Sequence, residues 1–132
     1  MLLALALATA TPDAAADVVR RYYALLAARN YAQAWRLWGD DGRASGKPEA
    51  AFARGFARTA TTSVNIGRPG RVEGAAGSLY VTVPVTVSAR LLDGTRQHFT
   101  GSYTLRRVND VPGSTARQRR WHIASAHLRP HA

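Results

Sequence analysis

Acid–base catalysis commonly uses a carboxylate that is held in a pocket, where its pKa is shifted toward the working pH. The chain contains eight carboxylate side chains, and each falls at an expected helix start, loop or turn: Asp13, Asp17, Asp40, Asp41, Glu49, Glu73, Asp93 and Asp110. Asp40 and Asp41 directly follow a helical stretch, so their corner could overhang a pocket. A solvated turn is the preferred interpretation of this pair, and we assign no catalytic residue.

Imidazoles are the next candidates, and the chain has four histidines but no cysteine. Without cysteine, disulfides, thiolate metal sites and a thiol nucleophile are excluded. His98 and His122 are expected to lie near each other on one face of adjacent strands. Two imidazoles without a carboxylate make a poor zinc site, so a pair of surface side chains is preferred and no metal is expected. His127 follows Trp121 and Ile123 at a spacing of two residues, which predicts that it shares their face of the strand and points toward the helices, at a pocket rim or in the core.

Arginine dominates the charge of the chain. Lys and Arg number 18 against 8 acidic residues, a formal net charge of +10, and Lys47 is the only lysine. Arg106, Arg107, Arg119 and Arg120 are expected around the last hairpin, where they could bind anions. Solvated surface arginines are the simpler interpretation, and no aromatic side chains alternate with them to stack bases, so nucleic acid is disfavoured. Lipid headgroups, cell-wall polymers and acidic proteins are the anions we expect.

The elements that must position these side chains are helices followed by strands. Thr11-Pro12-Asp13 is typical of a helix start, and Asn30 is expected to end this helix and cap a second one. A third helical stretch begins at Pro48. The period then changes to two, which predicts strands over residues 64–72, 79–91, 97–108 and 121–128. Helices packed on one face of a curved antiparallel sheet form an α+β fold.

Two local features refine this prediction. Asp93-Gly94 indicates a hairpin with a type I′ turn. Pro84 cannot donate a hydrogen bond within a sheet, so a bulge or bend is expected there. The chain of 132 residues is long enough for one domain and too short for two.

The first helix pair carries a family resemblance. Residues 18–35 read VVRRYYALLAARNYAQAW, which resembles the Tyr-Tyr, Asn-Tyr and Ala spacing of the NTF2-like (SnoaL-like, cystatin-like cone) superfamily. Residues 101–107 and 120–123 are similar to the last hairpin of the same superfamily. The resemblance implies a cone with a pocket between helices and sheet. It implies no single activity, because the superfamily includes isomerases, dehydratases and ligand carriers.

Aromatic residues at helical spacing are mostly core, but in a cone some of them line the cavity. We expect Trp35, Phe52, Phe56 and Trp121 to be packed. The predicted ligand pocket consists of Tyr22, Trp38, Tyr103 and His127. The phosphate-binding loop, dinucleotide, nucleophile-elbow and zinc-protease motifs are absent from the sequence, and no cofactor is expected.

Residues 1–10, MLLALALATA, are apolar and end in a small-residue triplet, as at a signal-peptide cleavage site. We therefore expect a signal remnant over 1–10, a single domain over 11–132, and a periplasmic or secreted location. The predicted function is non-catalytic binding of a small apolar ligand, a protein or an anionic surface, with a homodimer left open. A pocket enzyme of the isomerase or dehydratase kind is the alternative.

Overall fold

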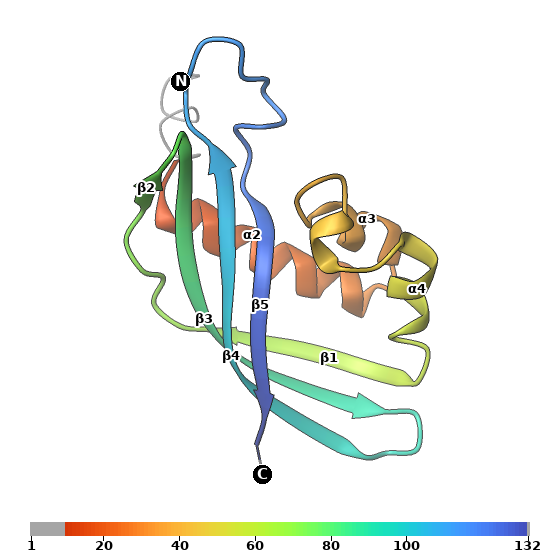
Figure 1. The fold of residues 1–132 in the computed structure, drawn as a ribbon. Helices are drawn as coiled ribbons and strands as arrows, with labels where there is room; N and C mark the ends of the chain where they lie inside the picture. The colour runs from red at the N-terminus through yellow and green to blue at the C-terminus, as the bar shows by residue number, and fades with distance from the viewer. Residues whose placement is uncertain (1–9, 132) are drawn as a thin grey trace.

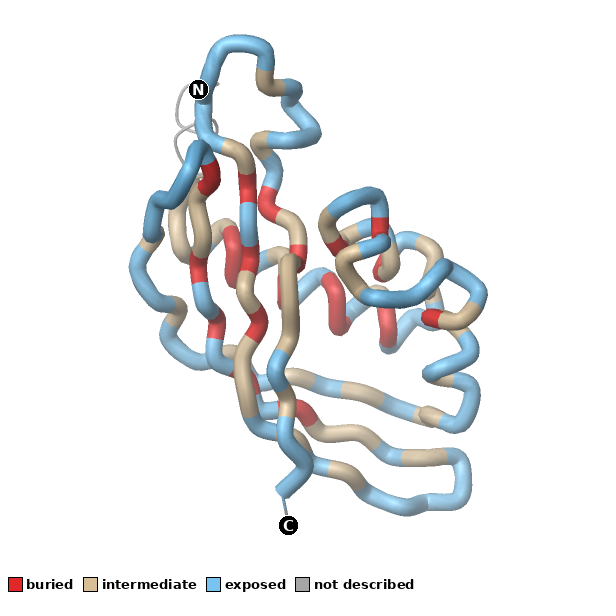
Figure 2. Tube along the Cα trace, in the orientation of Figure 1, coloured by how far each residue is buried: buried red, intermediate tan, exposed pale blue. Residues whose placement is uncertain are grey.

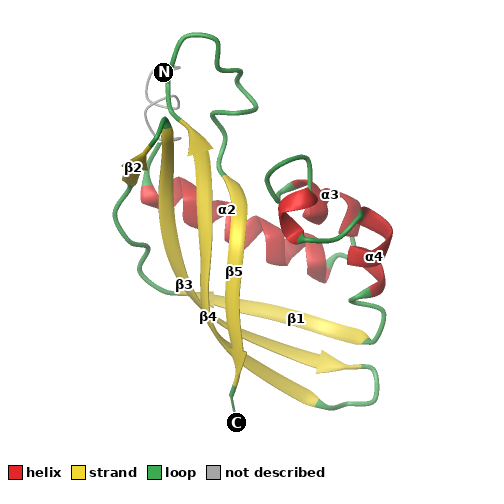
Figure 3. Ribbon diagram, in the orientation of Figure 1, coloured by secondary structure: helices red, strands yellow, loops and turns green. Residues whose placement is uncertain are grey.

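The computed structural model describes residues 10–131 as helices packed against one curved antiparallel sheet (Figures 1 and 3). The helical elements are α2 (Pro12–Ala27), α3 (Tyr31–Arg36), the short 3-10 helix η1 (Arg43–Ser45) and α4 (Glu49–Arg54). The strands are β1 (Thr59–Ile66), β2 (Glu73–Ala75), β3 (Ser78–Leu91), β4 (Arg96–Val108) and β5 (His122–Pro130). The expected α+β class is confirmed. The expected signal segment lies outside the described residues, except for Ala10.

Both predicted helix caps are present. The Thr11 hydroxyl accepts a hydrogen bond from the Ala14 amide at 3.1 Å, and Pro12 occupies the first turn of α2. The Asn30 side chain accepts from the Gln33 amide at 3.3 Å and begins α3. Because only a few residues separate α2 from α3, the two helices meet at a tight corner. No helix in the described part of the chain is long and apolar enough to cross a membrane.

The sheet has the order β1-β3-β4-β5, and β2 pairs with the start of β3. The strongest prediction holds along β3, where Val81, Val83, Val85 and Val87 are buried and the residues between them are exposed. These valines pack against α2, whose buried side chains include Val19, Tyr22, Tyr23 and Leu26. In Figure 2 the buried positions follow α2 and the central strands. We call the sheet face that points away from α2 the outer face.

Two local predictions were wrong, and a third was wrong in one of its two alternatives. The first strand begins at Thr59 and ends at Ile66, because its β-branched start pairs with the end of β3. At the β3–β4 turn Gly94 has φ +90° but Asp93 does not have a positive φ, so the turn is not type I′. Of the bulge or bend expected at Pro84, the bulge is absent, because Pro84 pairs in register with Ser102.

Pro84 fits in β3 because of where β1 ends. The Pro84 carbonyl accepts a hydrogen bond from Gly67 at 2.8 Å, just beyond the last β1 residue. The N–H and C=O of one strand residue point to the same side, so the nitrogen of Pro84 also points toward the segment between β1 and β2. Since no strand pairs with β3 there, the missing donor breaks no ladder hydrogen bond.

A bulge lies in β5 instead. Thr104 pairs with Ser125 and Leu105 with Ile123, which leaves Ala124 as an extra residue. The extra residue reverses the alternation that begins at Trp121 and Ile123. His127 consequently pairs with Ser102 on the outer face and is exposed. The prediction that His127 faces the helices is wrong.

Candidate functional site

The interior between α2 and the sheet is built from aromatic rings. Three of the four predicted pocket residues meet there, with ring centroids 5.9 Å apart for Tyr22 and Tyr103, 6.2 Å for Tyr22 and Trp38, and 6.5 Å for Trp38 and Tyr103. All three are at least nine-tenths buried. Phe52 and Tyr23 extend the cluster through contacts with Tyr22. The structure therefore brings three of the four predicted residues together, packed on one another, whereas His127 lies on the outer face.

Polar atoms inside this aromatic cluster are few, and the residues that carry them are buried. The hydroxyl oxygens of Tyr23 and Tyr103 are 2.6 Å apart. Burial raises the pKa of Tyr23 to about 12, and burial also raises the pKa of Tyr22 and of Tyr103. The indole N–H of Trp38 is buried beside Tyr22, and no described residue lies in ordinary hydrogen-bond geometry with it. These tyrosines stay protonated at neutral pH, so the cluster offers no ionised base.

Outside this interior, a wide cleft of about 1300 Å³ opens beside the edge strand β5. One wall is the corner between α3 and η1, and the other is the loop that joins β4 to β5. In Figure 1 this loop and the α3 corner stand on either side of the start of β5. Tyr22, Trp38 and Tyr103 do not line the cleft.

Positive charge dominates the lining of this cleft. Two aspartates, Asp40 and Asp41, and one histidine, His122, lie among six arginines. The arginines are Arg21, Arg36, Arg106, Arg107, Arg117 and Arg120. They come from α2, α3, β4 and the loop before β5, so distant parts of the sequence converge on one space. A concave surface with this excess of guanidinium groups attracts anions.

The corner that carries the aspartates is held against the sheet. The Ile123 amide donates to the Leu37 carbonyl at 2.8 Å, and the Gly39 amide donates to the Ile123 carbonyl at 2.9 Å. Asp40 and Asp41 then have φ values of +54° and +53°, which aspartate tolerates better than most residues. The corner therefore lies at the cleft, outside the aromatic interior whose mouth it was expected to overhang.

Each aspartate of the corner is paired with an arginine. Asp40 accepts from Arg43 at 3.3 Å, and Asp41 accepts from Arg117 across the cleft at 3.1 Å. All four side chains are about two-thirds exposed or more. A catalytic carboxyl is normally desolvated and oriented, whereas these carboxylates are solvated ion-pair partners.

His122 is the titratable group that the cleft perturbs. Its Nδ1–H donates to the Arg120 carbonyl at 3.0 Å, which leaves Nε2 as the unprotonated nitrogen of the neutral ring. Burial lowers the pKa of His122, and the positive charges of Arg120 and Arg117 lower it further. The ring is therefore neutral at pH 7, and the charge of the cleft comes from arginine.

The four predicted anion-binding arginines divide into two groups. Arg106, Arg107 and Arg120 line the cleft, and Arg107 is a buried cation that pairs with Asp110 at 3.4 Å. Arg119 does not line it. The guanidinium group of Arg119 donates to the Ser114 carbonyl at 2.6 Å and pairs with Asp110 at 3.4 Å, so it holds the β4–β5 loop.

Arg21, Arg36 and Arg117 belong to the cleft but were not among the predicted anion-binding residues. Arg117 stands in the same charged run as Arg119 and Arg120, which was the available signal. Arg21 and Arg36 had none, because their place depends on how α2 and α3 pack beside β5.

The predicted proximity of His98 and His122 is wrong. His122 pairs with Arg106 near one end of β4, whereas His98 lies near the other end and contacts His131, with ring centroids 5.8 Å apart. Across the described residues, no group of three His, Asp or Glu side chains is placed to hold a metal ion.

Comparison with known proteins shows that one solved structure has a similar fold. The sequence matches no protein-family model, and no curated protein matches it. Among solved structures, the crystal structure of the Kfla4162 protein from Kribbella flavida is similar, with a TM-score of 0.61 and 18% sequence identity. The match covers 89% of this chain and 88% of that one. The architecture is thus shared along nearly the whole chain.

Proposed function

We propose that the protein is an exported NTF2-like domain that binds anionic groups in the arginine-lined cleft without chemical turnover. The excess of six arginines over two aspartates in a single cleft is the observation that carries this proposal. The order of helices followed by a curved sheet agrees with the superfamily resemblance. Phosphate, sulfate and carboxylate groups are the ligand chemistry that guanidinium forks match best.

Packing supports an anionic ligand over a small apolar one. The rings of Tyr22, Trp38 and Tyr103 occupy the interior that an apolar ligand would need. The pocket-enzyme alternative also has less support, because the carboxylates of the cleft are exposed and ion-paired.

Pyrophosphate binding at low salt tests the proposal. Arg36 and Arg120 line the cleft, are exposed and have no ion-pair partner among the described residues. We expect the double variant Arg36→Ser/Arg120→Ser to weaken pyrophosphate binding about tenfold or more, because each charge-assisted hydrogen bond contributes about 1.5 kcal/mol or more. Isothermal titration calorimetry measures the change.

The matched control is Arg54→Ser/Arg58→Ser. These arginines are also exposed but do not line the cleft. The control removes the same net charge and should change the affinity by less than about threefold, through the weakened long-range field alone. Equal losses in the two double variants would mean that pyrophosphate senses only net charge, and the cleft would not be the site.

A further inference from the structure

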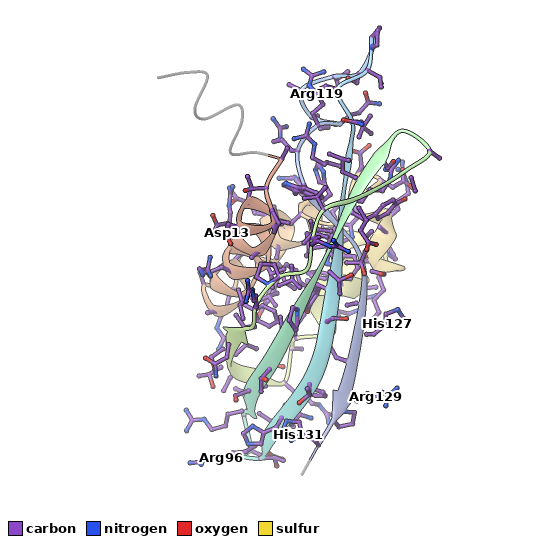
Figure 4. All side chains as sticks on the ribbon, turned by 90° about the vertical axis from the view of Figure 1, so that its left-hand side faces the viewer. Asp13, Arg96, Arg119, His127, Arg129 and His131 are labelled. Carbon is purple, nitrogen blue, oxygen red and sulfur yellow. The ribbon has the colours of Figure 1, made fainter. Side chains whose placement is uncertain are left out.

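The outer face of the sheet carries a second concentration of positive charge. At the end nearest the β3–β4 turn, three adjacent strands and the residue that follows β5 present six exposed basic residues on this face. They are Arg90, Arg96, His98, His127, Arg129 and His131, and we call them the hairpin-end patch. Figure 4 shows Arg96, Arg129 and His131 together at one end of the molecule, with Arg119 at the opposite end.

No carboxylate among the described residues forms an ion pair with the arginines of this patch. Arg90, Arg96 and Arg129 form no ion pair with any residue that the structure describes. Arg90 and Arg96 are direct cross-strand partners, and like charges in that position destabilise a sheet. An anionic partner would remove this repulsion.

The acidic residues of the neighbouring turn and strand make other contacts. Asp93 lies in the connecting turn, where its carboxylate accepts from the Thr95 amide at 2.9 Å. Glu73 of β2 pairs with Tyr80 near the other end of the sheet. The outward residues of β1, β3, β4 and β5 include no Asp or Glu.

Hydroxyl groups surround the patch. Thr86 pairs with Thr100, and Thr100 pairs in turn with Arg129. Ser102 pairs with His127. Each of these side chains points away from α2, so cations and hydroxyls alternate over a continuous face.

We propose that the hairpin-end patch binds an acidic polysaccharide along the direction of the strands. Such a polymer carries carboxylates or sulfates for the arginines and free hydroxyls for the threonine and serine side chains. It requires charge and hydrogen-bonding groups only, which are the two properties that this face supplies.

Other classes of anionic partner need features that the patch lacks. Single-stranded nucleic acid uses aromatic rings on which bases stack, and the six patch residues include none apart from imidazoles. Stable protein interfaces use buried aromatic or aliphatic anchors. Membrane-surface binding by a helix or sheet gains strength from several apolar side chains at the acyl boundary, whereas the one exposed leucine near the patch, Leu92, lies in the β3–β4 turn and the patch residues themselves are basic.

The patch is separate from the arginine-lined cleft. Arg96 and Arg106 are ten residues apart on β4, which corresponds to about 33 Å along a strand. A small anion in the cleft therefore cannot reach the patch. Different variants therefore test the cleft proposal and the patch proposal.

A galacturonate oligomer tests the polysaccharide proposal, because each unit carries a carboxylate and free hydroxyls. We expect the triple variant Arg90→Ser/Arg96→Ser/Arg129→Ser to raise the Kd for this oligomer about tenfold or more at low salt, with a shallower salt dependence. Its affinity for pyrophosphate should change by less than about threefold, through the weakened long-range field alone. Since the variant removes the repulsion between Arg90 and Arg96, its Tm should equal or exceed that of the natural chain.

The matched control is Arg54→Ser/Arg68→Ser/Arg71→Ser, which removes three exposed arginines elsewhere. It should raise the Kd for the oligomer by less than about threefold. Equal losses in the two triple variants would overturn the proposal. Tighter binding of duplex DNA or of phosphatidylglycerol vesicles, abolished by the same patch variant, would also overturn it and assign the patch to that partner.

Discussion

Gly42 lies directly against the indole ring of Trp35. A Cβ placed on Gly42 would stand 2.3 Å from Cε2 of that ring, and the residue has φ +92°. Both the close approach and the left-handed backbone therefore require glycine here. Since Asp40 and Asp41 immediately precede it, this contact fixes the corner that forms one wall of the cleft.

We predict that Gly42→Ala destabilises the protein by about 3 kcal/mol, because a strained φ adds to displacement of a packed ring. Urea unfolding followed by tryptophan fluorescence measures the change. The control is Gly46→Ala, at a residue with φ +82° and no atom within 4 Å of the added Cβ. It isolates the backbone strain and should cost about 1 kcal/mol. Equal losses would show that the Trp35 contact adds nothing.

The second prediction concerns the buried hydroxyl pair of Tyr23 and Tyr103. Tyr103→Phe leaves the Tyr23 hydroxyl buried without its partner at 2.6 Å, which should cost about 1–2 kcal/mol of unfolding free energy. The double variant Tyr23→Phe/Tyr103→Phe removes both polar groups and should recover part of that loss. A double-mutant cycle measures the coupling. Strictly additive losses would mean that the hydroxyls do not interact.

Local patterning predicted the framework of the fold well. The alternation of Val81 to Val87 and the caps at Thr11 and Asn30 depend on nearest neighbours in sequence, and the structure contains all of them. Pro84 was misjudged because its tolerance depends on β1 ending at Ile66, which the sequence of β3 does not record.

The site was harder to predict, because an inserted strand residue or the packing of a helix decides which side chains meet there. One extra residue, Ala124, reverses the facing of His127. The charge count left anion binding open, but it could not distinguish Arg120, which lines the cleft, from Arg119, which holds a loop. Arg21 and Arg36 join the cleft only through the placement of α2 and α3.

The third prediction is a pH dependence of stability through His122. Burial lowers its pKa in the folded protein, so as pH falls the unfolded chain, with a histidine pKa of about 6.5, binds the proton first. The resulting stability is complete above about pH 6.5 and is lost as pH falls through the folded-state pKa.

In His122→Asn the amide can still donate to the Arg120 carbonyl, but the group no longer titrates. We expect the unfolding free energy of the natural chain to fall more than that of this variant between about pH 8 and about pH 5. Urea unfolding at intervals over this range gives both curves. Parallel curves would contradict a lowered pKa at His122, since the other histidines contribute equally to both proteins.

The fourth prediction is that neutralising Asp41 strengthens anion binding, which is the opposite of the loss expected on neutralising a functional carboxylate. Asp41 occupies Arg117 in an exposed ion pair at 3.1 Å, and exposed pairs contribute only about 0–1 kcal/mol to stability. Asp41→Asn keeps a residue type that accepts φ +53°, while it releases Arg117 and removes a negative charge from the cleft. We expect unchanged stability and about threefold tighter pyrophosphate binding at low salt, through the stronger positive potential of the cleft.

Asp17→Asn is the control, because Asp17 also pairs with an exposed arginine but lies on α2 outside the cleft. It should leave the affinity nearly unchanged. Weaker binding in Asp41→Asn would mean that the carboxylate assists the ligand, and would return Asp41 to the role of a functional acid or base.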